Sequence, residues 1–184
     1  HARFGCDARG KLQAVAVDAL FDTGAYASWG PTVATRVPIH ATGPYAVRNV
    51  RTRGRAYFTH CHPSGAFRGF GVPQGAIAHE ALMDDLADRL GMDRLEFRRL
   101  NALAAGDTTA TGQRIEHSAG LGQCLDRLKP HWLRLRAAAE AFNAKAKKKG
   151  NPLRRGVGVG CMWYGIGNTA LANPSTLRIA LAPP

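Results

Sequence analysis

The sequence has few cysteines, few acidic residues and no long apolar run. Its four cysteines lie far apart and form no CxxC pair: Cys6, Cys61, Cys124 and Cys161. Scattered cysteines in a chain of this length are typical of reduced thiols in a cytosolic protein. An iron–sulfur cluster held within this chain is not expected, because such clusters need several closely spaced cysteines. No stretch of about 18 apolar residues exists, so we expect no membrane-spanning helix.

The first residues show neither an initiating methionine nor the charged-then-apolar pattern of a secretory leader. The chain starts at His1, inside a polar and strand-like stretch. We therefore expect a cytoplasmic protein, and we expect the 184 residues to be an internal part of a longer polypeptide. Hydrophobic residues make up 45% of the sequence, which is enough to bury a core and excludes a disordered chain.

The charge is strongly one-sided, with 25 basic and 13 acidic residues. One basic block lies on an expected strand, where Arg51, Arg53 and Arg55 share a face because strands have a period of two. A second block covers residues 144–155. Two interpretations stay open for these charges. One is a solvated face, or a face that meets acidic surface elsewhere in the protein; the other is a nucleic-acid-binding surface. The first is favoured, because no nucleic-acid-binding motif accompanies the charge.

Local patterns predict an α+β fold with mixed strands, an N-terminal β-hairpin and three to four helices in the middle. The hairpin covers residues 2–22, with a turn at Asp7 to Gly10. Further elements are expected as follows: one or two helical turns in 32–45, limited by Pro38; a strand over 48–60; helices over 73–91 and 93–103; one or two helices in 118–149, divided near Pro130; a buried strand over 156–166; and a closing strand over 175–181.

The helix over 73–91 has the strongest signals. Pro73 suits the first helical position, and Gly91 suits the residue just beyond the end. Asp93 can then cap the next helix. Apolar residues recur near helical spacing at Ile77, Leu82, Leu86 and Leu90, with Met83 and Ala87 beside them.

A glycine-rich segment, SGAFRGFGVPQG over residues 64–75, leads directly into this helix. Glycines allow the backbone to approach a ligand closely, and a helix N-terminus can present N–H groups to an anion. Phe67 and Phe70 offer flat apolar faces, and Arg68 offers a fixed charge. These features suit a ligand that is part planar ring and part oxyanion. A tight turn with both phenylalanines in the core is an equally good interpretation.

Two weaker motifs are set aside. GIGNTA over residues 165–170 matches GxGxxA, but Pro174 follows too soon for the helix of a dinucleotide-binding fold. His60, Cys61 and His62 resemble metal ligands, but they are too few for a closed site and are interpreted as polar residues at a strand end.

A longer pattern, made of several consecutive stretches, identifies a protein family far more specifically than either of these two motifs. GAFRGFGVPQ is followed by HEALMDDLADRLGMDRLEFRRLNAL and then by GDTTATGQ. DTGAYASWGPTVATRVPIHATGPY precedes it, and RRGVGVGCMWYGIG follows. Together these stretches resemble the molybdenum-binding chain of the molybdenum hydroxylases, the xanthine dehydrogenase and aldehyde oxidase family. The resemblance covers most of the sequence and implies that residues 1–184 are a partial molybdopterin-binding domain.

The resemblance also implies roles for particular residues. Phe67, Arg68 and Gly69 match the loop that lies against the molybdenum–molybdopterin cofactor. Phe70 matches an aromatic residue that stacks on a ring substrate, and Arg36 matches an arginine that binds oxygen substituents of purines. The implied substrate is a purine or another N-heterocycle, with an aldehyde as the alternative.

The implied reaction is hydroxylation with water as the source of oxygen. No catalytic residue is expected within the chain, because the family's general-base glutamate should lie outside it. Iron–sulfur clusters, with FAD as an optional further cofactor, are expected on partner chains or domains. The segment should therefore be inactive without the remainder of its chain. A non-catalytic nucleic-acid-binding domain, using Arg51, Arg53, Arg55 and the lysines of 145–149, is the alternative of another class.

Overall fold

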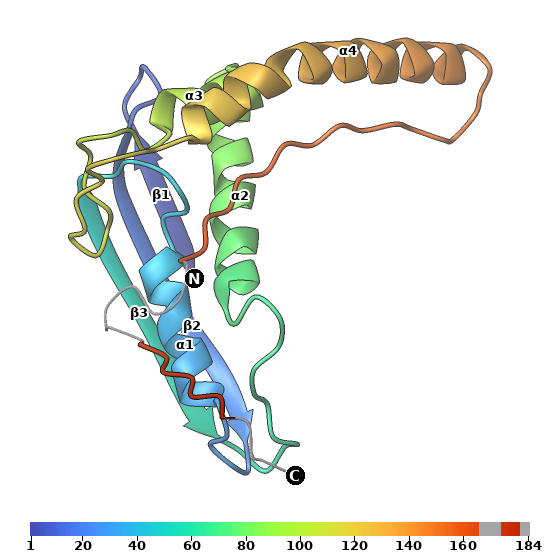
Figure 1. The fold of residues 1–184 in the computed structure, drawn as a ribbon. Helices are drawn as coiled ribbons and strands as arrows, with labels where there is room; N and C mark the ends of the chain where they lie inside the picture. The colour runs from blue at the N-terminus through green and yellow to red at the C-terminus, as the bar shows by residue number, and fades with distance from the viewer. Residues whose placement is uncertain (166–173, 181–184) are drawn as a thin grey trace.

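The computed structural model describes residues 1–165 and 174–180. It confirms the α+β class, with a mixed three-stranded sheet and four helices in the described part of the chain (Figure 1). The elements follow in this order: β1 (Ala2–Cys6), β2 (Leu12–Gly24), α1 (Gly30–His40), β3 (Asn49–Phe58), α2 (Val72–Arg89), α3 (Arg94–Asn101) and α4 (Leu121–Lys148).

The sheet has the order β1-β2-β3. β1 and β2 form the predicted antiparallel hairpin, with Ala2 opposite Val17. The Asp7 carboxylate closes the turn by accepting hydrogen bonds from the N–H groups of Arg9 and Lys11, both at 2.9 Å. β2 and β3 are parallel, and α1 makes the crossover between them. The carboxyl ends of these two strands therefore lie at the same end of the sheet.

α1 is longer than the one or two turns that Pro38 was expected to allow. It runs for 11 residues with Pro38 inside it. The proline lies near the end of the helix, so its missing N–H affects only the last turn. Burial of Val33, Ala34 and Val37 against the sheet compensates for this loss. At Gly54 of β3, an added Cβ would lie 2.4 Å from the Ala34 carbonyl oxygen, so glycine allows this close packing.

α2 begins at Val72, so Pro73 is its second residue. The apolar residues of the predicted pattern divide between a buried and an exposed part of the helix surface, with Leu82 and Leu86 partly buried. Ile77 is 74% exposed, whereas His79, Met83 and Ala87 are completely buried. Several faces of this helix carry apolar residues, and contact with β1, α1 and α3 selects among them. Gly91 follows the helix in the left-handed conformation, with a φ of 63°, as expected.

A buried ion cluster joins α2 to α3. The Arg98 guanidinium is fully buried and contacts Glu80 and Asp84, each at 2.8 Å. The Tyr45 hydroxyl donates to Glu80 at 2.6 Å. Burial, together with the Glu80 charge, raises the pKa of Tyr45, so this hydroxyl remains a donor. Each charged group therefore has partners, as burial of charge requires.

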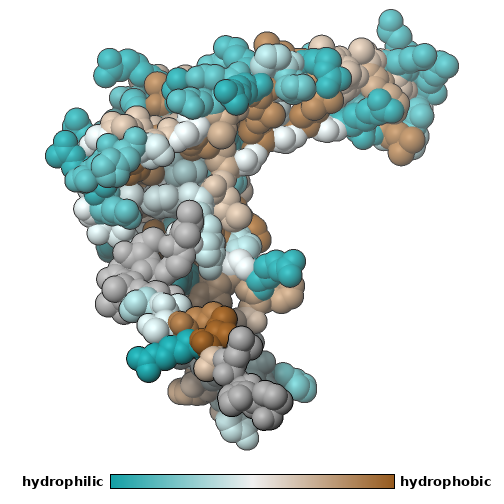
Figure 2. Space-filling model, in the orientation of Figure 1, coloured by the Kyte–Doolittle hydropathy of each residue, from teal (hydrophilic) through white to brown (hydrophobic). Residues whose placement is uncertain are grey.

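Asp93 caps α3 as predicted. Its carboxylate accepts hydrogen bonds from the N–H groups of Leu95 and Glu96, and it also accepts one from Trp132 Nε1 of α4. α4 is a single helix that continues through Pro130, so the expected division there is wrong. It projects from the body (Figure 1), and hydrophilic side chains gather at its far end (Figure 2).

Neither of the two expected C-terminal strands forms within the described residues. Residues 156–165 are extended and Cys161 is buried, but the Cys161 N–H donates to Glu80 Oε2 at 3.0 Å rather than to a neighbouring strand. Burial lowers the pKa of His79, so its neutral ring can hydrogen-bond the Cys161 carbonyl. Residues 174–180 are exposed and unpaired, and most of the GIGNTA motif lies outside the described residues.

The residues that the structure describes include no helix long and apolar enough to cross a bilayer. In residues 1–165 and 174–180, no group of three or more histidine, cysteine or acidic side chains could hold a metal ion.

Candidate functional site

The glycine-rich segment starts near the carboxyl end of the parallel strands, where α1 begins, and leads past α1 to the start of α2 (Figure 1). Backbone hydrogen bonds tie the first residue of this segment, and Thr59 just after β3, to the end of β2. The Thr59 N–H donates to the Gly24 carbonyl at 3.1 Å, and the Ser64 N–H donates to the Thr23 carbonyl at 3.0 Å. Open α/β sheets bind ligands at the carboxyl ends of their strands, so this is the expected end for a site.

The backbone of the segment is left-handed at three successive residues. Gly69, Phe70 and Gly71 have φ angles of 96°, 51° and 94°. A bulky side chain such as phenylalanine rarely adopts a positive φ, and such strain is concentrated at functional sites. Ser28, with a φ of 43°, is the other non-glycine residue of this kind in the described part of the chain, and it lies at the same end.

The two glycines are needed because of close packing as well as conformation. A Cβ added at Gly69 would lie 2.4 Å from Pro73 Cγ. A Cβ added at Gly71 would lie 2.6 Å from the Val33 carbonyl oxygen of α1. The segment is therefore pressed between the two helices, and this packing imposes the position of Phe70.

We expect Gly71→Ala in the full-length protein to open this segment. The substitution adds a clash with Val33 to the strain of a left-handed alanine, which costs about 1–3 kcal/mol by itself. Hydrogen exchange over residues 67–76 should accelerate at least about tenfold. Gly112→Ala is the matched control, because Gly112 has a φ of 88° but no atom within 4 Å of the added Cβ. An equal response around both sites would contradict the packing argument.

The structure brings together two of the predicted site residues, Arg36 and Phe70. The Arg36 guanidinium carbon, from α1, lies 5.8 Å from the centre of the Phe70 ring. The Trp29 ring packs edge-on against Phe70, with 6.2 Å between ring centres. Phe70 thus has both a cation and a second aromatic ring as neighbours.

Phe67 and Arg68 stand away from this contact and are exposed; Phe67 is 84% accessible. The Phe67 carbonyl accepts the Phe70 N–H at 2.8 Å, which closes a turn between them. Within the described part of the chain, the N–H groups of Arg68 and Gly69 have no hydrogen-bond acceptor. The outer side of the turn therefore offers two backbone donors beside an exposed ring.

A groove of about 670 Å³ lies next to the segment, between β2 and the two helices. Its wall includes side chains or backbone of Val17, Phe21, Val33, Ser64, Gly65 and Gln74. The start of the glycine-rich segment thus forms one wall of a concave and partly apolar surface, the usual setting of a small-molecule site.

Reasoning from the sequence did not single out Trp29 as a contributor to this site. The residue lies in the DTGAYASWGP stretch, whose resemblance was noted as a whole. Only the position of α1 beside the segment brings Trp29 against Phe70.

A family model described as "Molybdopterin cofactor-binding domain" matches residues 1–102. Among curated relatives, the chain is 50% identical over 127 residues to the nicotinate dehydrogenase large molybdopterin subunit of Eubacterium barkeri, covering 69% of this chain and 30% of the relative. It is 38% identical over 168 residues to the aldehyde oxidoreductase of Megalodesulfovibrio gigas, covering 91% of this chain and 18% of the relative.

Solved structures agree with these sequence matches. The aldehyde oxidoreductase of Desulfovibrio desulfuricans superposes with a TM-score of 0.72 and 33% identity, over 76% of this chain and 15% of that one. The chain thus spans less than a third of the length of each of these relatives. On these matches, the chain belongs to the molybdopterin cofactor-binding domain family of the molybdenum hydroxylases.

Proposed function

We propose that residues 1–184 form one wall of the cofactor and substrate site of a molybdenum hydroxylase that oxidises an N-heterocycle carrying an oxo or carboxylate substituent. Phe70 carries the proposal, because a strained backbone and two neighbouring side chains hold its ring at the expected end of the sheet. The 50% identity to a nicotinate dehydrogenase subunit supports an N-heterocycle as the substrate class.

The residues of the glycine-rich segment fit a molybdopterin cofactor. The N–H groups of Arg68 and Gly69 can donate to its polar atoms, and the exposed Phe67 ring can cover a planar part of it. The positive φ of Gly69 and Gly71 fixes the shape of this turn of the backbone. When bound, the cofactor would supply the two-electron redox chemistry of the hydroxylation.

The chain's own part in the reaction is to bind and orient the substrate. A ring stacked on Phe70 would be placed within reach of Arg36, whose guanidinium can donate two hydrogen bonds to a carboxylate or one to an oxo group. The general base, the iron–sulfur clusters and any flavin would be provided by other parts of the chain or by partner chains.

The test uses the full-length protein, isolated with its partner chains. We expect it to contain molybdenum and to hydroxylate nicotinate or xanthine. Arg36→Met should lower kcat/KM for that substrate about 10- to 100-fold, since a charged hydrogen bond contributes about 1.5–3 kcal/mol. Oxidation of an aromatic aldehyde should stay within about twofold, because it offers Arg36 no anionic group.

Two outcomes would contradict the proposal. A protein without molybdenum would exclude the hydroxylase function. Oxidation of benzaldehyde but of neither N-heterocycle would favour the aldehyde-oxidising alternative, and Arg36 would then have no role in substrate binding.

A further inference from the structure

One face of the sheet is uncovered in the described part of the chain. α1 packs on β2 and β3, and α2 packs on β1, all on the same face. On the opposite face, Leu20 is 59% and Tyr57 is 47% exposed. β2 and β3 are a parallel pair, and parallel strands are usually covered on both faces. This arrangement indicates that protein covers the second face in the complete enzyme.

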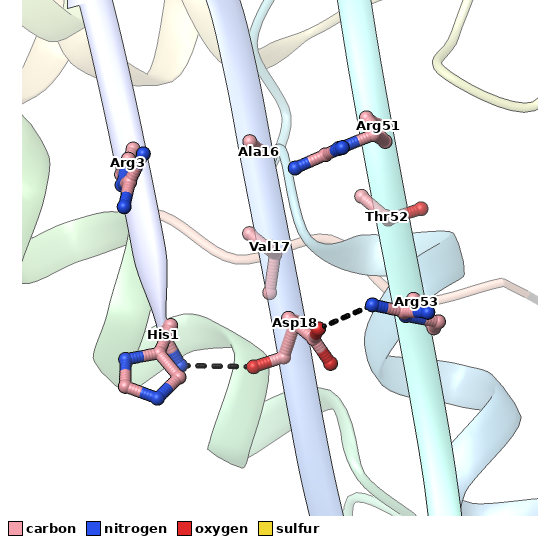
Figure 3. Close-up of a pocket in the computed structure, with 8 residues that line it drawn as sticks. All are labelled: His1, Arg3, Ala16, Val17, Asp18, Arg51, Thr52 and Arg53. Carbon is pink, nitrogen blue, oxygen red and sulfur yellow. Dashed lines mark hydrogen bonds and ion pairs between the residues drawn. The ribbon is translucent and has the colours of Figure 1, made fainter.

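The uncovered face is cationic. The strand register places Arg3 of β1 and Arg51 of β3 on either side of Ala16 of β2. Figure 3 views the sheet from this face, with both arginines flanking the small alanine and the helices behind the strands. The three positions line a shallow cavity of about 470 Å³.

The single carboxylate in this cavity is already engaged. Asp18 accepts hydrogen bonds from Arg53 at 2.9 Å and from Arg55 at 3.1 Å. The hydrogen bond from Arg53 contributes most to lowering the pKa of Asp18, so the carboxylate stays ionised. Arg3 and Arg51 have no acidic partner among residues 1–165 and 174–180. Two cations thus face the same hollow without compensation.

These features define what can cover the face. An apolar surface would leave two guanidinium groups buried without partners, which is costly. A surface with carboxylates would satisfy both, because a guanidinium binds a carboxylate through two parallel hydrogen bonds. Ala14 and Ala16 have small side chains, so carboxylate side chains of a covering surface can reach the sheet between the arginines.

We propose that an acidic surface from another domain of the same polypeptide docks on this face and places carboxylates between Arg3 and Arg51. The curated relatives carry most of their length outside the region that this chain matches, so such a domain is available in proteins of this kind. The interface is separate from the glycine-rich segment, which lies at the end of the sheet.

The test introduces a cross-linkable cation into the full-length enzyme. Arg51→Lys keeps the charge and adds an amine that a carbodiimide can join to a carboxylate in direct contact. We expect peptide mapping to find Lys at position 51 linked to an aspartate or glutamate outside residues 1–184 of the same polypeptide. Arg127→Lys, at an exposed position on α4, is the matched control and should yield no such defined link.

A second variant tests the proposal independently of whether the amine and a carboxylate lie close enough to be cross-linked. Arg3→Glu combined with Arg51→Glu should accelerate hydrogen exchange in β3 about tenfold or more, by repelling the acidic surface. Four outcomes would overturn the proposal: a link only to Asp18, a link between two copies of the chain, β3 exchange unchanged in the double variant, or salt-dependent DNA binding that this variant abolishes. The last outcome would identify the face as a nucleic-acid surface. Molybdenum content and hydroxylation report on the proposed function separately.

Discussion

Phe70→Ala in the full-length, cofactor-containing enzyme is expected to lower kcat/KM for a heterocyclic substrate about 10- to 100-fold. Stacking of a planar base on an aromatic side chain contributes about 1–3 kcal/mol, and this contribution is lost with the ring. The left-handed backbone and the contacts with Trp29 and Arg36 hold the Phe70 ring in one place, so a substrate can stack on it without ordering it first.

Phe58→Ala is the matched control for this prediction. Phe58 is another aromatic residue at the same end of the sheet, where it is 69% exposed and has no aromatic stacking partner in the described part of the chain. Its removal should change kcat/KM less than about twofold, as is usual for a substitution at an exposed surface position. Steady-state kinetics with nicotinate and xanthine give kcat/KM for both variants and so test the prediction. If both variants lost activity equally, or Phe70→Ala kept full activity with normal molybdenum content, Phe70 would not contact substrate.

Arg98→Ala is expected to destabilise the core by about 3–5 kcal/mol, the usual cost of removing one partner from a buried ion pair. Arg98 is fully buried and neutralises both Glu80 and Asp84. Without it, Glu80 would lose its arginine partner between α2 and α3, and Asp84 would keep only Arg94. Glu80 also holds the Cys161 N–H, so the extended segment around Cys161 should loosen as well.

Hydrogen exchange of the full-length protein measures this effect locally, without requiring two-state unfolding of a large enzyme. Protection of α2 around Met83 should fall by about two to three and a half orders of magnitude, corresponding to the expected loss. Arg99→Ala is the control, because Arg99 pairs with Asp126 on the surface, where the side chains are 46% and 54% exposed. A surface pair contributes about 0–1 kcal/mol. A similar response to both substitutions would show that burial of Arg98 does not matter for stability.

Much of the fold could be predicted from local signals. Asp7 and Gly10 mark the hairpin turn, Asp93 marks the start of α3, and Gly91 marks the end of α2, all as the structure has them. These signals work because each depends on hydrogen bonds and φ angles within a few residues. The glycine-rich segment was also recognisable, because its unusual backbone needs glycine at particular positions.

The errors fall where distant contacts override local preference. Pro38 and Pro130 both lie within helices, because packing of neighbouring residues compensates for a missing hydrogen bond. The extended stretch around Cys161 was predicted to be a strand, but the Cys161 N–H donates to the Glu80 carboxylate of α2 instead of to a neighbouring strand. Local sequence can indicate that such a segment is extended. It does not indicate which hydrogen-bond acceptor the N–H groups of the segment will contact.

By itself, then, the sequence determined the hairpin, β3, α2 and α3, the family resemblance and the identity of the residues in the glycine-rich segment. Tertiary structure alone decided which face of α2 is buried, that Arg98 lies in the core, and that Trp29 and Arg36 hold Phe70. It also decided that Arg3 and Arg51 face one hollow. The physical reason is that local patterns record short-range backbone preferences, whereas these contacts depend on where the chain returns after a helix or a crossover.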